Sequence, residues 1–256
     1  MNKPKIAVHK FSSCDGCQLA IINLGESLLI LSQLVEITHF AEAGALDENA
    51  TVDIAIIEGS VSTSEDVTRL QKIRDNSSYL MTVGACATSG GIQALRNMAK
   101  TSQWIADIYA NPAVIDSLDN STPIKNHVKV DLELWGCPIS QRQLLMAIRA
   151  LLFGVMPVEE HDKVCMECKR QQTVCVMVTK NEACMGPVTR TGCGALCPRV
   201  GRDCYGCYGP AENVNTQAMA NRLEGLGLIK DEVARRFLFI NSGAEQLHQQ
   251  VQRWET

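Results

Sequence analysis

The chain has 256 residues, of which 46% are hydrophobic, and its formal net charge is −4 at pH 7. A chain of this length buries roughly three quarters of its unfolded surface on folding, so it needs no disulfides to hold a core together. The slightly acidic balance, without a basic patch, argues against nucleic-acid binding. There is no apolar run of membrane-spanning length and no N-terminal targeting signal, so the sequence predicts a cytoplasmic protein that does not bind membranes.

Residues 1 to about 155 alternate strand-like and helix-like patterns, which is typical of βαβ units. The predicted strands are residues 5–11, 35–40, 52–61, 79–84 and 128–136. The predicted helices are residues 14–34, a helix opened by a Ser62 and Glu65 capping box, one after Gly90-Gly91, and residues 141–152. This alternation favours an α/β fold with a flavodoxin-like, doubly wound parallel sheet.

The pattern changes from about residue 161. Residues 161–210 hold eight cysteines and few apolar runs, so this segment is not expected to build a hydrophobic core of its own. Helical spacing returns from about residue 213 and indicates helices that pack in a core. The sequence therefore predicts two domains. These are an α/β domain of residues 1–157 and an irregular, cysteine-rich domain of residues 158–256 with C-terminal helices.

Twelve cysteines are unusual for a protein in a reducing compartment, where clustered thiols are more often metal ligands or catalytic groups than disulfides. Four of them, Cys14, Cys17, Cys86 and Cys137, each follow a predicted strand. Ligands of open parallel sheets bind at the carboxyl ends of the strands, so these four are expected to converge. A thioredoxin-type C-x-x-C motif would leave Cys86 and Cys137 unexplained, whereas a four-cysteine zinc site stays open.

The other eight cysteines divide by spacing into two groups of four. The groups are Cys165, Cys168, Cys175 and Cys184, then Cys193, Cys197, Cys204 and Cys207. Four thiolates at such short spacing suit either zinc or an iron–sulfur cluster. Spacing alone therefore leaves two zinc ribbons possible, and it also allows ligands to be exchanged between neighbouring clusters.

Six motifs in a fixed order carry a family resemblance: SSCDGC, IIEGSV, GACATSGG, WGCP, CMGPVT and CYGC. Together they resemble the small, electron-transferring subunit of [NiFe] hydrogenases, over nearly the whole chain to about residue 210. The resemblance implies that Cys14, Cys17, Cys86 and Cys137 (the proximal set) bind a [4Fe–4S] cluster that faces the nickel–iron site of the large subunit.

The resemblance also implies two further clusters. Cys165, Cys168, Cys175 and Cys184 (the distal set) match a distal cluster, with Cys165 where membrane-bound relatives have histidine. Cys193, Cys204 and Cys207 match the three ligands of a medial [3Fe–4S] cluster, and Cys197 is an addition. The resulting medial set of four implies a [4Fe–4S] cluster of lower potential, as in the cytoplasmic, NAD(P)-linked, sulfhydrogenase-type branch (group 3), to whose delta subunits the chain is similar.

From this resemblance we expect an electron-transfer subunit that relays electrons through three [4Fe–4S] clusters. Its expected partners are a NiFe-bearing large subunit, a flavin- and NAD(P)-binding diaphorase subunit and a ferredoxin-like subunit. The chain has neither the paired C-x-x-C motifs that bind nickel nor a G-x-G-x-x-G dinucleotide motif, so no catalytic residue is predicted in it. The alternatives are a coenzyme F420-reducing hydrogenase subunit and a zinc-binding interaction module.

Two charged residues near the motifs have open roles. Glu58 ends a predicted strand, where it could meet the large subunit, form hydrogen bonds near the proximal cluster, or be an ordinary strand-end carboxylate. His161 precedes Cys165 by four residues, and with four cysteines at hand we expect a surface or packing histidine rather than a ligand.

Overall fold

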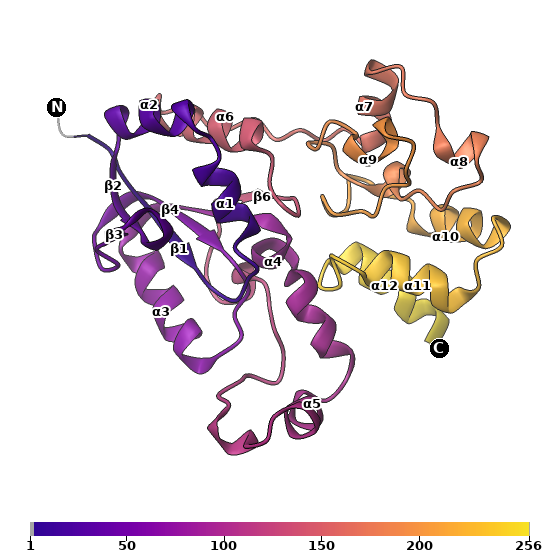
Figure 1. Cartoon of the computed structure of the whole chain (residues 1–256), viewed down its shortest axis with the longest axis horizontal. Coiled ribbons are helices and arrows are strands. Elements are labelled where there is room, and N and C mark those ends of the chain that lie inside the picture. Colours follow the sequence, from indigo (N-terminus) through magenta and orange to yellow (C-terminus); the bar gives the residue numbers. More distant parts are fainter. Residues whose placement is uncertain (1–2, 256) are drawn as a thin grey trace. The chain divides into compact units, whose positions relative to one another are not determined.

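The computed structural model describes residues 3–255 of the chain, and the side chains of residues 3–252. By compactness the chain divides into two units, Met1–Leu134 and Trp135–Thr256, whose elements are shown in Figure 1. The expected division after residue 157 stays a prediction.

The first unit contains the sheet and five α-helices. Its strands are β1 (Lys5–Lys10), β2 (Glu36–Phe40), β3 (Ala45–Leu46), β4 (Val52–Glu58), β5 (Ser77–Val83) and β6 (Leu132–Leu134). Its helices are α1 (Gly16–Ile22), α2 (Glu26–Leu34), α3 (Ser64–Asp75), α4 (Gly84–Ser89) and α5 (Thr101–Ile108). A buried core of aliphatic side chains from β1, β4, β5 and α3 holds these elements together.

The strand order is β3-β2-β1-β4-β5-β6, and every neighbouring pair is parallel except β2 and β3. Without the two-residue strand β3, this is the order of a flavodoxin-like sheet, with its switch point between β1 and β4. The α/β fold class predicted from the sequence is therefore confirmed. The antiparallel edge strand β3, which follows a left-handed turn at Gly44, makes the sheet mixed and was not expected.

Two predicted element ends were wrong. The capping box of α3 is formed by Thr63 and Asp66, with hydrogen bonds of 3.1 and 3.0 Å, because the Ser62 hydroxyl is engaged by Ser121. The strand expected over residues 128–136 is confined to β6. Before it, the carboxylate of Asp131 accepts the Leu80 N–H (2.9 Å) in place of a backbone carbonyl.

Two predicted helices also differ from the observed ones. The helix expected over residues 14–34 is broken into α1 and α2, because Gly25 between them has a positive φ of +56°. After Gly90 the chain forms a 3-10 helix over Gly91–Met98 and then α5. No single helix in the described residues is long and apolar enough to cross a membrane, and only the pair α1 and α2, bent by 82°, meets the length and composition criteria together.

Two histidines, His9 on β1 and His39 on β2, stack in the interior of the first unit with ring centroids 4.7 Å apart. Only 2% of His9 is exposed. Burial, together with the neighbouring His39 and Arg69, lowers the pKa of His9 to about 3, and burial also lowers the pKa of His39. Both rings are therefore neutral in the folded protein at neutral pH, and unfolding lets them take up protons at mildly acidic pH.

We expect His9→Leu to reduce the acid sensitivity of the chain. The stabilising contribution of neutral His9 is complete above its unfolded pKa of 6.5 and is lost as the pH falls toward about 3. Between pH 6.5 and 5 this loss amounts to about 2 kcal/mol, at ~1.4 kcal/mol per pH unit. Urea unfolding at pH 7.5 and pH 5 measures it, with the exposed His248→Gln as a control that follows the wild type. Equal losses in the wild type and His9→Leu would contradict the prediction.

The second unit is helical and irregular. Its helices are α6 (Gln141–Leu152), α7 (Val164–Arg170), α8 (Val176–Thr179), α9 (Leu196–Arg199), α10 (Thr216–Gly225), α11 (Lys230–Leu238) and α12 (Glu245–Glu255). The bounds of α6 match the predicted helix, and the C-terminal helices α10 to α12 are present as predicted.

The cysteine-rich segment does have a hydrophobic core, which it shares with the C-terminal helices. Val164 and Met185 from the segment are fully buried in one cluster with Leu223 of α10 and Phe237 of α11. The sequence predicted that residues 161–210 do not build a core of their own. In the structure they build one together with the C-terminal helices. The structural role of α10 to α12 follows from this packing.

Candidate functional site

Three strand ends of the first unit lie in register at one edge of the sheet. Lys10 at the end of β1 pairs with Glu58 at the end of β4, and Glu58 pairs with Val83 at the end of β5. Cys14 and Cys17 follow β1, and Cys86 follows β5 on α4. The topology thus brings these three proximal-set cysteines to the carboxyl edge beside the switch point. Cys137, three residues past β6, lies near the start of the second unit.

Glu58 is buried at this edge and binds the segment that carries Cys17. Only 2% of Glu58 is exposed, its Oε1 accepts the Cys17 N–H (3.0 Å), and its Oε2 accepts the Gln18 side-chain amide (2.8 Å). Burial raises the pKa of the Glu58 carboxyl, and these two hydrogen bonds oppose the rise. Of the roles considered from the sequence, the structure supports hydrogen bonding beside a proximal-set cysteine.

Cys86 lies against a glycine that has no room for a side chain. A Cβ on Gly91 would lie 2.7 Å from the Cys86 Sγ and 2.8 Å from its Cα, and the φ of Gly91 is +58°. The Cys86 thiol also donates to the Gln93 side-chain oxygen (3.0 Å). Gly91 therefore provides the close backbone approach beside Cys86.

The distal-set cysteines of the second unit lie close enough to influence one another electrostatically. Cys165 and Cys168 are on α7, Cys175 precedes α8, and Cys184 is buried. A Cβ on Gly186 would lie 3.4 Å from the Cys184 Sγ and 3.5 Å from the Cys165 Sγ. Burial, then the neighbouring Cys165, Cys184 and Cys175 thiols, raises the pKa of Cys168 to about 11.

The medial-set cysteines form a second group. Burial, together with the neighbouring Cys193, Cys137 and Cys197 thiols, raises the pKa of Cys207 to about 12. Burial also raises the pKa of Cys204, with Cys184 and Cys207 as charged neighbours. Cys204 also lies beside the distal-set Cys184, and Cys207 beside the proximal-set Cys137, so the division of the eight cysteines into two sets stays a prediction.

Backbone amides already point at several of these sulfurs. The Cys204 N–H donates to the Cys184 Sγ (3.3 Å) and the Gly206 N–H to the Cys204 Sγ (3.4 Å). The Cys193 sulfur accepts from Leu196 and Ala195 and lies close to Glu167, and the Cys207 sulfur accepts from Cys137. Sulfurs that accept N–H bonds inside a buried, glycine-rich loop suit thiolate ligands of iron–sulfur clusters, so these residues fit that group.

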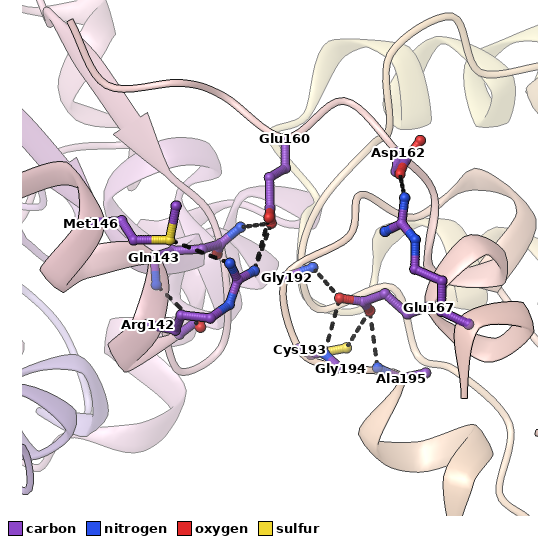
Figure 2. A network of polar contacts seen from close by, with 12 residues as sticks. Arg142, Gln143, Met146, Glu160, Asp162, Glu167, Gly192, Cys193, Gly194 and Ala195 are labelled. Atoms are coloured by element: carbon purple, nitrogen blue, oxygen red, sulfur yellow. Dashed lines mark hydrogen bonds and ion pairs between the residues drawn. The ribbon is translucent and has the colours of Figure 1, made fainter. Parts of the chain in front are cut away.

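Glu167 contacts the medial-set loop, although it lies between two distal-set cysteines in the sequence. Its carboxylate accepts the N–H groups of Gly192, Gly194 and Ala195, as Figure 2 shows. Only 8% of Glu167 is exposed. Sequence reasoning missed this residue, and the signal available was an acidic residue inside the C-M-E-C motif, where neighbouring thiolates should repel it.

Comparison with known proteins assigns the family. The family model of the NADH ubiquinone oxidoreductase 20 Kd subunit matches residues 14–151, which is more than half of the chain. The sulfhydrogenase 2 subunit delta of Pyrococcus furiosus is 34% identical, over 91% of this chain and 97% of that protein. The chain belongs to this family and is a hydrogenase subunit.

Two further matches agree with this assignment. A vhu subunit of the F420-non-reducing hydrogenase of Methanocaldococcus jannaschii is 28% identical, over 90% of this chain and 92% of that protein. A solved NAD+-reducing [NiFe]-hydrogenase chain superposes with a TM-score of 0.58 at 27% identity, over 62% of this chain and 96% of that chain. The hydrogenase subunit is therefore part of an oxidoreductase complex.

His161 of the hydrogenase subunit pairs with a carboxylate. Its Nδ1 lies 3.1 Å from the Glu212 Oε2, and both side chains are more than half exposed. This contact supports the surface role expected from the sequence. Among the described side chains of residues 3–252, the His, Cys, Asp and Glu residues form no group of three or more that is arranged to hold a single metal ion.

Proposed function

We propose that the hydrogenase subunit carries electrons between a NiFe site in a large subunit and an NAD(P)-linked acceptor subunit, through three [4Fe–4S] clusters. The proximal set would hold one cluster, the medial set the second and the distal set the third. Each cluster would supply one-electron transfer when bound. The NAD(P) link draws on the solved NAD+-reducing hydrogenase chain that this chain resembles.

The observation that carries the proposal is the contact between residues of neighbouring sets in the second unit. The N–H of the medial-set Cys204 donates to the Sγ of the distal-set Cys184 (3.3 Å). The N–H of the proximal-set Cys137 donates to the sulfur of the medial-set Cys207. Each pair of neighbouring sets is thus joined by a hydrogen bond from a cysteine of one set to a sulfur of the other. This supports a chain of closely spaced redox centres rather than three independent sites.

The surrounding residues contribute burial and hydrogen bonds. Cys184 and Cys204 are each 6% exposed, so the fold keeps water from these sulfurs. Burial disfavours a thiolate in the absence of a positive partner, which is why the pKa values of these thiols are raised, and binding a cluster would release their protons. Amide donors and burial are two of the means by which a protein tunes the potential of such a centre.

The proposed partners follow from the same relay. A NiFe-bearing large subunit would face the proximal set at the carboxyl edge of the sheet, where Cys14 is exposed. A flavin- and NAD(P)-binding diaphorase subunit, with a ferredoxin-like subunit as a further component, would accept electrons on the side of the distal set, where Cys175 is exposed. The chain itself would bind neither hydrogen nor nucleotide.

We expect the anaerobically purified protein to be brown and to contain about twelve iron atoms per chain, four for each four-cysteine set. Metal analysis together with electron paramagnetic resonance (EPR) spectroscopy of the dithionite-reduced protein measures this. Colourless protein that contains zinc alone would contradict the proposal and favour an interaction module. Incubation of the purified complex with hydrogen and each electron acceptor in turn then identifies the acceptor. Reduction of coenzyme F420 in place of NAD(P)+ would favour the alternative function, that of a coenzyme F420-reducing hydrogenase subunit.

A further inference from the structure

The Glu167 side chain turns away from solvent and into the loop formed by residues 191–196. It lies on α7 between Cys165 and Cys168, yet its carboxylate reaches a segment more than twenty residues further along the chain. Figure 2 shows the carboxylate with backbone groups of the loop around it. A buried carboxylate has to be hydrogen-bonded to offset its lost hydration, and here the loop provides every donor.

Three residues of the loop donate backbone N–H groups to this one carboxylate. The Glu167 Oε1 accepts the N–H groups of Gly192 (2.9 Å) and Gly194 (3.1 Å), and the Oε2 accepts that of Ala195 (2.9 Å). Cys193 lies inside this loop, and its Sγ is 3.8 Å from the Oε2. The ligand sulfur and the carboxylate are therefore held side by side.

The loop adopts a conformation that suits this contact. Gly194 and Ala195 both have positive φ, +67° and +49°. For alanine this left-handed conformation costs roughly 1–2 kcal/mol. Successive N–H groups in such a loop form a concave anion-binding nest, and the Glu167 carboxylate occupies it. One helical turn further on, the Gln171 amide donates to the Gly194 carbonyl (3.0 Å) and holds the same loop.

We propose that Glu167 is a positioning residue that holds Cys193 in place for the medial cluster and, through its charge, lowers the reduction potentials of the medial and distal clusters. The inference rests on the proposed function, because it assumes that both sets bind clusters. Its two components are a contact, which fixes one medial-set ligand, and a charge, which acts on both sets.

The charge acts on both sets because of where Glu167 lies. It is adjacent in sequence to the distal-set Cys168 and touches the medial-set Cys193. Reduction adds a negative charge to a cluster, and a nearby carboxylate disfavours that addition in a poorly solvated site. Removing the Glu167 charge should therefore raise both potentials and leave the proximal cluster unaffected as an internal reference.

Glu167→Gln separates this role from simple packing. Glutamine has the same shape, but its amide NH2 would face an N–H donor of the loop, so at least one of the three hydrogen bonds is lost together with the charge. Glu182→Gln is the matched control. Glu182 is also acidic and lies two residues before the distal-set Cys184, but it is exposed.

The experiment compares the anaerobically purified complex carrying the wild-type chain, Glu167→Gln or Glu182→Gln. Metal analysis counts iron, and redox titration followed by EPR gives the potential of each centre. We expect Glu167→Gln to shift the medial centre, and to a smaller extent the distal centre, to higher potential, or to lose the medial centre with about one third of the iron. The proximal signal is expected to stay at its wild-type potential, and Glu182→Gln to resemble the wild type.

Three results would overturn the inference. These are wild-type iron content and potentials in Glu167→Gln, equal shifts in Glu167→Gln and Glu182→Gln, or loss of all three centres at once, which would make the residue a requirement of the whole fold. A wild-type complex without iron–sulfur centres would instead refute the proposed function, so the two failures are distinguishable.

Discussion

Cys197→Ala is expected to convert the medial centre from a [4Fe–4S] to a [3Fe–4S] cluster and to leave the distal centre unchanged. Cys197 lies on α9, and its carbonyl accepts the N–H groups of Val200 (3.1 Å) and Arg202 (3.0 Å). Alanine keeps these backbone bonds and favours a helix, so only the thiolate is removed. Cys193, Cys204 and Cys207 would remain to hold three irons.

The change should raise the medial potential by on the order of 100 mV, since cluster type and net charge set the potential. For one electron, ~59 mV corresponds to a tenfold change in the equilibrium constant, so this shift is worth about fiftyfold. Hydrogen production should fall by up to about this factor, because electrons must then leave a high-potential centre uphill. Hydrogen oxidation should change less.

EPR of the oxidised complex measures the conversion, since a [3Fe–4S] centre gives a signal in that state. Cys175→Ala is the matched control, because it removes one exposed thiol of the distal set and should alter only the distal signal. A loss of the distal signal in Cys197→Ala would show that the eight cysteines are paired differently from our assignment.

Much of the first unit could be predicted because its signals are local. Apolar runs and βαβ alternation predicted the sheet, and Cys14, Cys17 and Cys86 follow strands whose ends are in register. The errors concern side chains that compete with the pattern. The Asp131 side chain accepts the Leu80 N–H, which a strand would bond to a backbone carbonyl, so β6 starts later than expected. The Ser62 hydroxyl is hydrogen-bonded to Ser121, so α3 is capped one residue later than expected.

The second unit could be predicted less well because its organisation depends on contacts between distant residues. Spacing grouped the cysteines, but it could not show that Cys204 donates to the Cys184 sulfur or that Glu167 enters the loop around Cys193. The Glu167 contact involves a loop in which Gly194 and Ala195 have a positive φ, and hydrophobic periodicity does not reveal such a conformation. The composition of residues 161–210 likewise could not predict that Val164 packs in one core with Phe237 of α11.

Gly91→Ala is expected to abolish the proximal centre while leaving the medial and distal centres in place. The new Cβ would lie 2.7 Å from the Cys86 Sγ and within 3 Å of the Cys86 backbone, so Cys86 would have to move. A displacement of about 1 Å at a reacting centre can cost on the order of 100-fold in rate. Because this centre is the proposed entry point for electrons, hydrogen-dependent reduction of the acceptor should fall by at least that factor.

Gly25→Ala provides the control, since both glycines have a positive φ but differ in their surroundings. Gly25 has a φ of +56°, nearly equal to the +58° of Gly91, and nothing lies within 4 Å of its Cβ position. An alanine is strained by the positive φ at either position, and unfolding measurements would show this in both variants. Iron content, EPR and hydrogen-dependent activity should fall in Gly91→Ala alone. Equal losses in both variants would mean that backbone strain, and not the contact with Cys86, limits the proximal site.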